Sequence, residues 1–440
     1  MAEPTPPRAS RPPSPRDIAL LRLDHAHLPG WPTGLTGRPP PEPASASDAA
    51  FAEVLYVGAV KRLLPLRWRL AHHAGRPLRA IDPLVQKILV LAAWQLTGLT
   101  HVPAAIAVDQ AVEQTRRFGR AKAAGLVNAV LRNVLRQPPP ELPAGTPLPE
   151  RLELLWGIPR AVAARLSDEL GPERAELLAA HADLTPPTIL RLYSGRSVED
   201  VARVLEAHPP PLPRVTPHMA DGLVVVDGGR REHFAALAEA GIAQVQDPAA
   251  AAVVPDMDLA PGLRVLDRCC GNGTKTLQIL DLLGPSGHID ATDPDGRRRD
   301  RLSALLARRG IGNVCVLPEP PPDAPPYDRV LLDVPCSNSA VLARRPEARF
   351  RQRESDLAPL QAVQQALLRD AAGCVKPGGL LVYSTCSLWR SENQQQVGRF
   401  LQSDGRFVLR MERLTLPACP DSDATRYTDG GYVAVMVRDR

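Results

Sequence analysis

Residues 263–276 read Leu-Arg-Val-Leu-Asp-Arg-Cys-Cys-Gly-Asn-Gly-Thr-Lys-Thr. An apolar run that contains Val265 and Leu266 leads into a turn with two glycines, Gly271 and Gly273, and then into a segment with helical spacing. Glycines in such a turn let the backbone approach a ligand closely, and the helix N-terminus offers unpaired N–H groups. The stretch therefore predicts a buried strand, a ligand-binding turn and a helix.

The same order of strand, turn and helix recurs from about residue 244 onward. The predicted strands span residues 263–266, 288–292, 314–317, 329–332, 380–384 and 432–437, and the predicted helices span residues 274–283, 297–309 and 361–374. Buried apolar strands that alternate with helices indicate an α/β fold with a doubly wound parallel sheet. The last strand follows a glycine turn at residues 429–431 and could pair antiparallel.

Two cysteine segments each end an apolar run of this predicted sheet. Residues 333–337 read Asp-Val-Pro-Cys-Ser, and residues 384–387 read Ser-Thr-Cys-Ser. Ligands of open α/β sheets bind outside the carboxyl ends of the strands, so Cys336 and Cys386 could face one pocket, where one thiol attacks and the other helps to release the product. A core position is the alternative for either thiol taken singly, because cysteine is often buried.

An acidic residue, Asp293, ends the next predicted strand, 26 residues after Asp267. A carboxylate in that place typically accepts the ribose hydroxyls of an adenosine cofactor. The alternative is that Asp293 caps the following helix.

The part of the chain before the predicted sheet differs from it in predicted secondary structure and in charge. We expect a flexible proline-rich tail at residues 1–16, an all-helical domain at 17–140, a mixed α/β connecting segment at 141–243 and the α/β domain at 244–440. Residues 1–150 carry 18 basic against 11 acidic side chains, whereas the whole chain has a net charge of +5. A basic N-terminal part favours a polyanionic partner such as RNA, although solvated helical faces are often as basic.

The composition also excludes several classes of protein. All seven cysteines lie at or after Cys269 without a C-x-x-C pair, and the ten histidines show no metal-binding spacing, so we expect neither disulfides nor a metal site. No run approaches the length of a membrane span, and the N-terminus has no apolar signal segment. The sequence thus predicts a cytoplasmic protein.

Taken together, these segments resemble the RNA 5-methylcytosine methyltransferases of the bacterial Sun/RsmB type, which act on 16S rRNA with S-adenosylmethionine. Residues 267–276 are similar to the family's cofactor loop, usually written D-x-C-A-A-P-G-G-K-T. Residues 333–337 match its D-A-P-C-S, and residues 385–387 its T-C-S, followed by the family-like pair Glu392 and Asn393. Residues 82–96 and 128–136 are similar to the family's NusB-type RNA-binding domain.

The resemblance implies a Rossmann-like catalytic domain and a role for each matched residue. Cys386 is expected to be the nucleophile that adds to carbon 6 of cytosine, Cys336 to assist elimination, and Asp333 to hydrogen-bond or protonate the base. The residues expected to bind the cofactor are Asp267, Cys269, Cys270, Gly271, Asn272, Gly273, Thr274, Lys275, Asp293, Glu319 and Asp333.

The chain departs from the family pattern at several of these positions. Asn272 and Thr274 replace a proline and a glycine of the cofactor loop, and Glu319 is the sole counterpart of the acid that binds adenine in the family. Residues 338–340, Asn-Ser-Ala, replace the usual A-T-G and bear on how the substrate fits. The basic residues between 344 and 353 would suit RNA phosphates, with an ordinary surface charge run as the alternative.

The favoured hypothesis is an S-adenosylmethionine-dependent methyltransferase that forms 5-methylcytosine in 16S rRNA, with no obligate protein partner. A cytosine-C5 methyltransferase of tRNA or another RNA is the second hypothesis. A non-catalytic RNA-binding ribosome assembly factor is the third. The G-x-G turn alone would also fit a nicotinamide-dependent oxidoreductase, for which the paired cysteines have no use.

Overall fold

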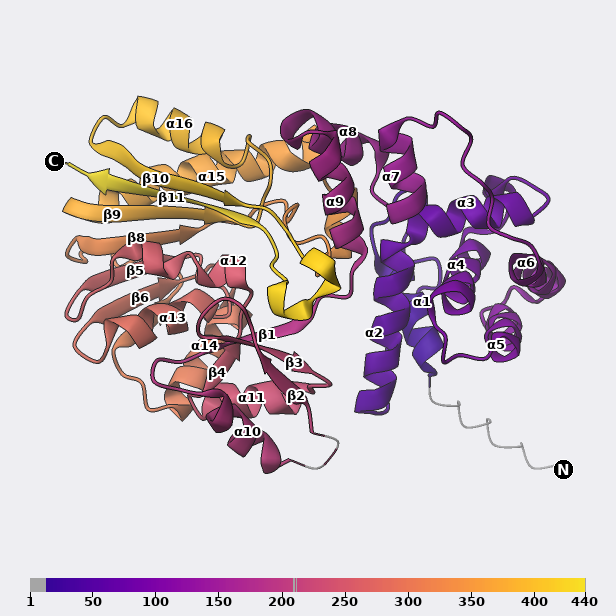
Figure 1. Ribbon diagram of the computed structural model, residues 1–440, viewed down its shortest axis with the longest axis horizontal. Helices are drawn as coiled ribbons and strands as arrows, with labels where there is room; N and C mark the ends of the chain where they lie inside the picture. Colours follow the sequence, from indigo (N-terminus) through magenta and orange to yellow (C-terminus); the bar gives the residue numbers. More distant parts are fainter. Residues whose placement is uncertain (1–12, 209, 211, 440) are drawn as a thin grey trace, which may run out of the picture. The chain divides into compact units, whose positions relative to one another are not determined.

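The computed structural model describes residues 13–208, 210 and 212–439 (Figure 1). The chain divides between Ala179 and Ala180 into two compact units. Most of the predicted tail lies outside the described residues. The predicted tail is nevertheless too long, because Ser14 accepts a hydrogen bond from the Asp17 N–H and begins helix α1 at Pro15.

The first unit is helical throughout. Its helices are α1 (Pro15–His25), α2 (Ala46–Lys61), α3 (Leu63–His73), α4 (Pro83–Gly98), α5 (Ala104–Arg117), α6 (Ala124–Arg136), α7 (Leu148–Trp156), α8 (Arg160–Leu170) and most of α9 (Pro172–Asp183). The last three were expected in the connecting segment. They extend the helical unit instead, since α7 packs against both α3 and α8.

Helix α4 forms the centre of this unit. Asp82 caps it through hydrogen bonds from the backbone N–H groups of Leu84 and Val85, and every residue from 84 to 93 is buried. A helix that is apolar on all sides must be surrounded by others, and α4 contacts α1, α2, α3, α5 and α6. Its buried Lys87 is neutralised by Asp24, with Nζ 2.7 Å from Oδ1.

The second unit contains two sheets. The smaller is antiparallel, with the strand order β2-β3-β1-β4. Its strands are β1 (Thr188–Leu192), β2 (Arg214–Pro217), β3 (Leu223–Asp227) and β4 (Ala243–Val245). Helices α10 (Val198–Glu206) and α11 (Arg231–Glu239) pack on one of its faces.

The larger sheet has the strand order β10-β11-β9-β8-β5-β6-β7. Five strands run parallel: β5 (Arg264–Arg268), β6 (His288–Thr292), β7 (Val314–Leu317), β8 (Tyr327–Asp333) and β9 (Val375–Thr385). Strand β11 (Gly431–Arg438) pairs antiparallel with β9 and with β10 (Phe407–Thr415). The predicted doubly wound sheet is confirmed, including its antiparallel last strand.

Helices cover both faces of this sheet (Figure 1). Helices α13 (Thr274–Leu283) and α14 (Gly296–Arg308) pack on one face, while α15 (Glu354–Cys374) and α16 (Gln394–Ser403) pack on the other. The chain leaves β5 toward β6 on one side and later returns to β8 on the other side. The carboxyl end of β5 is therefore the switch point where a ligand crevice is expected.

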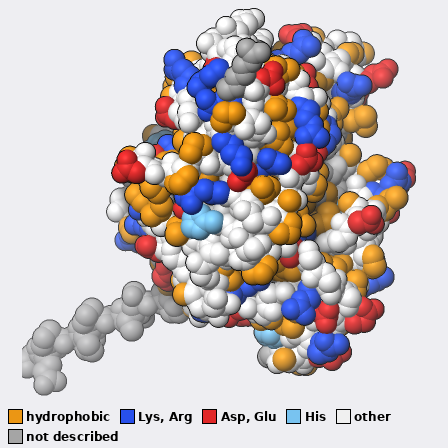
Figure 2. Space-filling view, turned by 90° about the vertical axis from the view of Figure 1, so that its left-hand side faces the viewer, with side chains coloured by type: hydrophobic (Ala, Val, Ile, Leu, Met, Phe, Trp, Pro, Cys, Tyr) orange, Lys and Arg blue, Asp and Glu red, His pale blue; other side chains and the backbone are white. Residues whose placement is uncertain are grey.

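The face of the molecule in Figure 2 carries basic and acidic side chains interspersed with apolar ones, as a water-facing surface does. Among the residues that the structure describes, no helix combines the length and the apolar character needed to cross a bilayer.

Candidate active site

The turn after β5 has the backbone shape that its sequence predicts. Cys269, Gly271 and Gly273 have φ values of +69°, +60° and +85°. Gly273 caps α13 without a side-chain hydrogen bond, and a Cβ at this position would lie 2.3 Å from Leu302 Cδ1. A Cβ at Gly271 would meet no atom within 4 Å. A side chain at position 273 would thus displace the buried Leu302, whereas Gly271 leaves space beside the turn.

Alanine substitutions should separate these two requirements. Gly273→Ala is expected to destabilise the protein more than Gly271→Ala, because both carry the left-handed strain of about 1–2 kcal/mol and only the first collides with Leu302. Thermal unfolding of both variants and wild type measures the difference. Equal melting temperatures for the two variants would contradict this account of the turn.

Asp267 lies at the carboxyl end of β5 and is fully buried. Its Oδ2 accepts a hydrogen bond of 2.6 Å from Thr276 Oγ1, but its Oδ1 has no hydrogen-bond partner. Burial, reinforced by the charge of Asp333, outweighs the hydrogen bond from Thr276 and raises the pKa of Asp267 to about 7. An unpaired buried acceptor of this kind suits a cationic ligand group.

A cavity of about 630 Å³ opens beside this turn. Its walls include the following predicted cofactor residues: Asp267, Cys269, Cys270, Gly271, Asn272, Thr274, Lys275, Asp293 and Asp333. Asp293 is buried, and its oxygens accept the backbone N–H groups of Gly271 (3.0 Å) and Asp295 (2.9 Å). Asp293 therefore braces the turn, and the N-cap of α14 is Asp295.

A smaller cavity of about 250 Å³ adjoins this one, and Lys275 and Asp333 are among the residues that line both. Lys275 Nζ donates a 2.7 Å hydrogen bond to Asp333 Oδ2. Burial lowers the pKa of Lys275, but the charge of Asp333 and this hydrogen bond outweigh it, so the pKa lies above its usual value. The lysine stays charged next to Cys386, which lines the smaller cavity.

The two predicted thiols meet at the ends of β8 and β9. Cys336 Sγ and Cys386 Sγ are 2.8 Å apart, and the Cys386 N–H donates to Cys336 Sγ over 3.2 Å. Cys386 Sγ also donates to Asn338 Oδ1 at 3.2 Å. Asn338 has a φ of +59°, and its Nδ2 donates to the Cys336 carbonyl. Asn338, which stands where the family motif has alanine, thus forms a hydrogen bond with each of the two cysteines.

Comparisons with known proteins identify the family of the chain. A family model described as 16S rRNA methyltransferase RsmB/F matches residues 256–420, and a model of the NusB family matches residues 37–136. The probable ribosomal RNA small subunit methyltransferase B of Synechocystis sp. is 32% identical over 376 residues, 82% of each chain. This chain belongs to the RsmB/F methyltransferase family. Ribosomal RNA small subunit methyltransferase B of Xanthomonas campestris is 32% identical over 81% of this chain and 80% of its own.

Solved structures share the fold of this family member. The crystal structure of PH0851 superimposes with a TM-score of 0.72 at 23% identity, covering 89% of this chain and 91% of its own. A methyltransferase homolog protein from Pyrococcus horikoshii has a TM-score of 0.53 at 23% identity, covering 67% of this chain and 99% of its own. The predicted fold, a Rossmann-like methyltransferase sheet preceded by a NusB-like domain, is confirmed.

Some predicted site residues of this methyltransferase have other partners in the structure. Glu319 pairs with Arg268 on a separate surface pocket, because even-numbered residues of β5 point to the opposite face from Asp267. In the basic segment, Arg344 lines the larger cavity but is held by Asp429 and Asp247, and Arg349 is fully buried with a hydrogen bond to the Ala182 carbonyl. Those two arginines therefore cannot serve the RNA phosphates for which the sequence suggested them.

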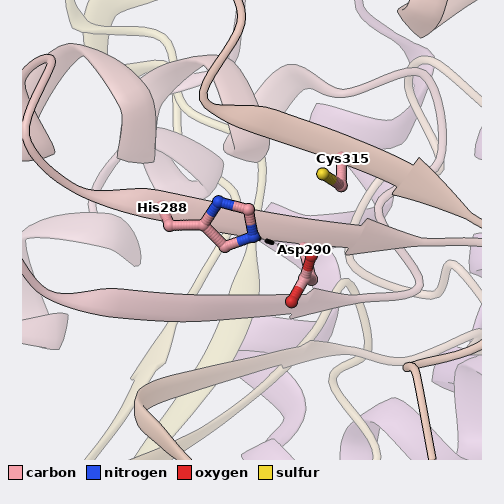
Figure 3. A group of neighbouring side chains, drawn as sticks. All are labelled: His288, Asp290 and Cys315. Carbon is pink, nitrogen blue, oxygen red and sulfur yellow. Dashed lines mark hydrogen bonds and ion pairs between the residues drawn. The ribbon is translucent and has the colours of Figure 1, made fainter. Parts of the chain in front are cut away.

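The structure also gathers three possible metal ligands that sequence spacing missed (Figure 3). A ring nitrogen of His288, a carboxylate oxygen of Asp290 and the Sγ of Cys315 lie within 4.8 Å of one another, on neighbouring strands β6 and β7. Both Asp290 oxygens are already engaged: Oδ1 accepts from His288, and Oδ2 accepts from Arg264 and Tyr327. With an arginine on this carboxylate, the group is best described as an ion-pair cluster.

Proposed function

We propose that the protein forms 5-methylcytosine in 16S rRNA, with S-adenosylmethionine as the methyl donor, in the cytoplasm. The observation that carries this proposal is the pair of thiols 2.8 Å apart at the carboxyl ends of β8 and β9. The ion pair of Lys275 and Asp333 links them to the larger cavity.

The residues of the larger cavity fit S-adenosylmethionine. Asp267 Oδ1 is a buried acceptor without a partner and suits the amino group of the methionine part. The open space at Gly271 and the uncapped N-terminus of α13 suit close backbone contacts and the carboxylate. When bound, the cofactor supplies a methyl group on a positively charged sulfur.

Binding of the cofactor should depend on the protonation of Asp267. Its pKa of about 7 means that it ionises near neutrality, so affinity is expected to weaken as the pH falls below 7. Calorimetric titration with S-adenosylmethionine between pH 5.5 and 8.5 measures this. The matched variant Asp267→Asn should bind more weakly and with a flatter pH dependence. The same dependence in both proteins would exclude Asp267 as the source.

The chain's own residues then account for the remaining chemistry. Cys386 gives up its thiol proton to water, and the thiolate forms a bond to carbon 6 of cytosine. The electron pair of the C5=C6 bond then moves to carbon 5, which takes the methyl group as the bond between that group and the donor sulfur breaks. Asp333 faces the same space and can hydrogen-bond the base as charge develops. Loss of the carbon-5 proton to water lets the C6–Sγ bond break, and its electron pair returns to Cys386. Cys336 stabilises the departing thiolate.

The helical unit is proposed to bind RNA. Lys122, which precedes α6, and Arg132 and Arg136 on α6 are exposed cations. Replacing all three with alanine should weaken RNA binding and reduce the slope of log K against log salt concentration by roughly 0.7–0.9 for each phosphate that the protein no longer neutralises. Filter binding at several salt concentrations measures both. Arg203→Ala, an exposed arginine paired with Asp200, is the control and should change neither.

The substrate is tested by methylation in vitro and in cells. Purified protein, labelled S-adenosylmethionine and either 16S rRNA or bulk tRNA should give label in the ribosomal RNA. Bisulfite sequencing of a deletion strain should show one cytosine of 16S rRNA that loses its protection. Label in tRNA alone would replace the ribosomal substrate, and no label in any RNA would favour a non-catalytic assembly factor.

A further inference from the structure

A buried carboxylate lies directly behind the two thiols. Glu392 is fully buried between β9 and α16. Its Oε1 accepts hydrogen bonds of 3.0 Å from the Ser337 N–H and from Gln364 Nε2. Its Oε2 accepts from Ser337 Oγ at 2.5 Å and from Ser387 Oγ at 2.6 Å. One carboxylate thus satisfies four donors.

These donors belong to the two cysteine loops and to the helix behind them. Ser337 directly follows Cys336, and Ser387 directly follows Cys386. Gln364, on α15, also donates to the carbonyl of Pro335, so the backbone is held on both sides of Cys336. Glu392 therefore ties together loops that are 50 residues apart in the chain.

The negative charge of Glu392 affects Cys336 in a way that a neutral side chain with the same hydrogen bonds would not. All four of these donors are neutral, so none of them cancels the charge, and burial of such a carboxylate is costly. The hydrogen bond to Cys386 and burial, followed by the charges of Cys386 and Glu392, place the pKa of Cys336 well above its usual value. The buried carboxylate thus disfavours a second negative charge on Cys336.

We propose that Glu392 is a positioning residue that aligns both cysteine loops and keeps Cys336 in its thiol form, as the hydrogen-bond donor to Cys386 Sγ. The roles of the two thiols rest on the proposed function. With its proton retained, Cys336 can stabilise the Cys386 thiolate both before attack and after the C6–Sγ bond breaks. The charge of Glu392 thus adds to the hydrogen bond with Cys386 and to burial, which also favour the thiol form of Cys336.

Apart from burial and Cys386, the other groups around Cys336 do not replace the charge of Glu392. Tyr383, on β9, is electrostatically coupled to Cys336, but burial first and then the charges of Cys336 and Glu392 place its pKa well above the usual value, so it is neutral at working pH. Asn338 is uncharged and donates to the Cys336 carbonyl. Lys275 and Asp333 neutralise each other beside Cys386. Replacing Cys386 and then Glu392 therefore separates the contributions of these two residues to the pKa of Cys336.

The test measures how readily Cys336 is alkylated at different pH values. In a Cys386→Ser background, iodoacetamide modification of the Cys336 peptide is followed by mass spectrometry from pH 7 to 11. Rates are divided by the high-pH plateau, so that altered access cancels. Adding Glu392→Gln should move the midpoint to lower pH, and modification below the midpoint should be about tenfold faster for each whole pH step by which the midpoint falls. An unchanged midpoint would overturn the proposal.

Matched variants separate charge from general disturbance. Asp328→Asn removes another buried carboxylate, at the opposite end of β8 from Asp333, and should leave the midpoint unchanged. Glu392→Asp keeps the charge and should keep the high midpoint, even if its shorter side chain lowers kcat. Should Glu392→Gln fail to fold, the midpoint in Glu392→Asp still decides the question, because a value as low as that of free cysteine would contradict the proposal.

Activity provides a second readout. In the otherwise native protein, Glu392→Gln should lower kcat while the KM for RNA stays nearly unchanged, and a raised KM alone would contradict a positioning role. The alkylation assay needs neither RNA nor cofactor. A failure of the proposed methylation would therefore leave the thiol result standing, and a failure of the thiol result would leave the methylation unaffected.

Discussion

Cys386→Ala is expected to abolish methyl transfer, with a loss of more than about 10³-fold in kcat, as for removal of other covalent nucleophiles. The physical reason is that carbon 5 of cytosine is too weak a nucleophile until a thiolate has added to carbon 6. The affinities for RNA and S-adenosylmethionine should stay nearly unchanged, because the smaller cavity loses only one sulfur atom. Single-turnover transfer of labelled methyl to 16S rRNA measures the loss.

Cys419 provides a matched control. It is a free cysteine outside both cavities, and Cys419→Ala should retain full activity. Turnover of Cys386→Ala near the wild-type level would remove Cys386 as the nucleophile and with it the covalent mechanism.

Cys336→Ala should leave attack possible but impair release, so that protein stays bonded to RNA. The expected result is a slow-migrating band on a denaturing gel that appears only with cofactor and RNA present. The reason is the 2.8 Å contact between the sulfur atoms, through which Cys336 stabilises the thiolate that departs from carbon 6.

Two further observations would check the origin of that band. It should vanish in the double variant Cys336→Ala/Cys386→Ala, which has no attacking thiol. Mass spectrometry of the adduct should place the nucleotide on the peptide that contains Cys386. An adduct on another cysteine, or rapid release from Cys336→Ala, would contradict the division of roles.

The sequence predicted most strands of the large sheet but missed β10, one of its two edge strands. Residues 274–283, 288–292 and 314–317 form a helix and two strands with the predicted bounds, because the period of their apolar residues differs between helix and strand. Strand β10 was missed, since it is an edge strand with Arg410, Glu412 and Arg413 among its residues. Its pairing with β11 stabilises it, and pairing leaves little signal in local composition.

The candidate site was likewise predicted only in part from the sequence. The convergence of Cys336 and Cys386 was predictable because parallel strands deliver their carboxyl ends to one edge of a sheet. The position of Glu319 was not, because a single residue on a loop can face either side of the sheet. Glu392 was predicted only as part of a family motif, and nothing in that motif indicates that its carboxylate is buried.

The sequence by itself determined the order of strands and helices, the turn at residues 269–273 and the placement of both thiols at strand ends. These features depend on local backbone preference and on the alternation of apolar residues. The tertiary structure alone decided that Asp293 braces the turn, that Arg344 is committed to Asp247 and Asp429, and that one carboxylate joins both cysteine loops. Such contacts join residues far apart in the chain, and they form only when the packed sheet brings those residues within hydrogen-bonding distance.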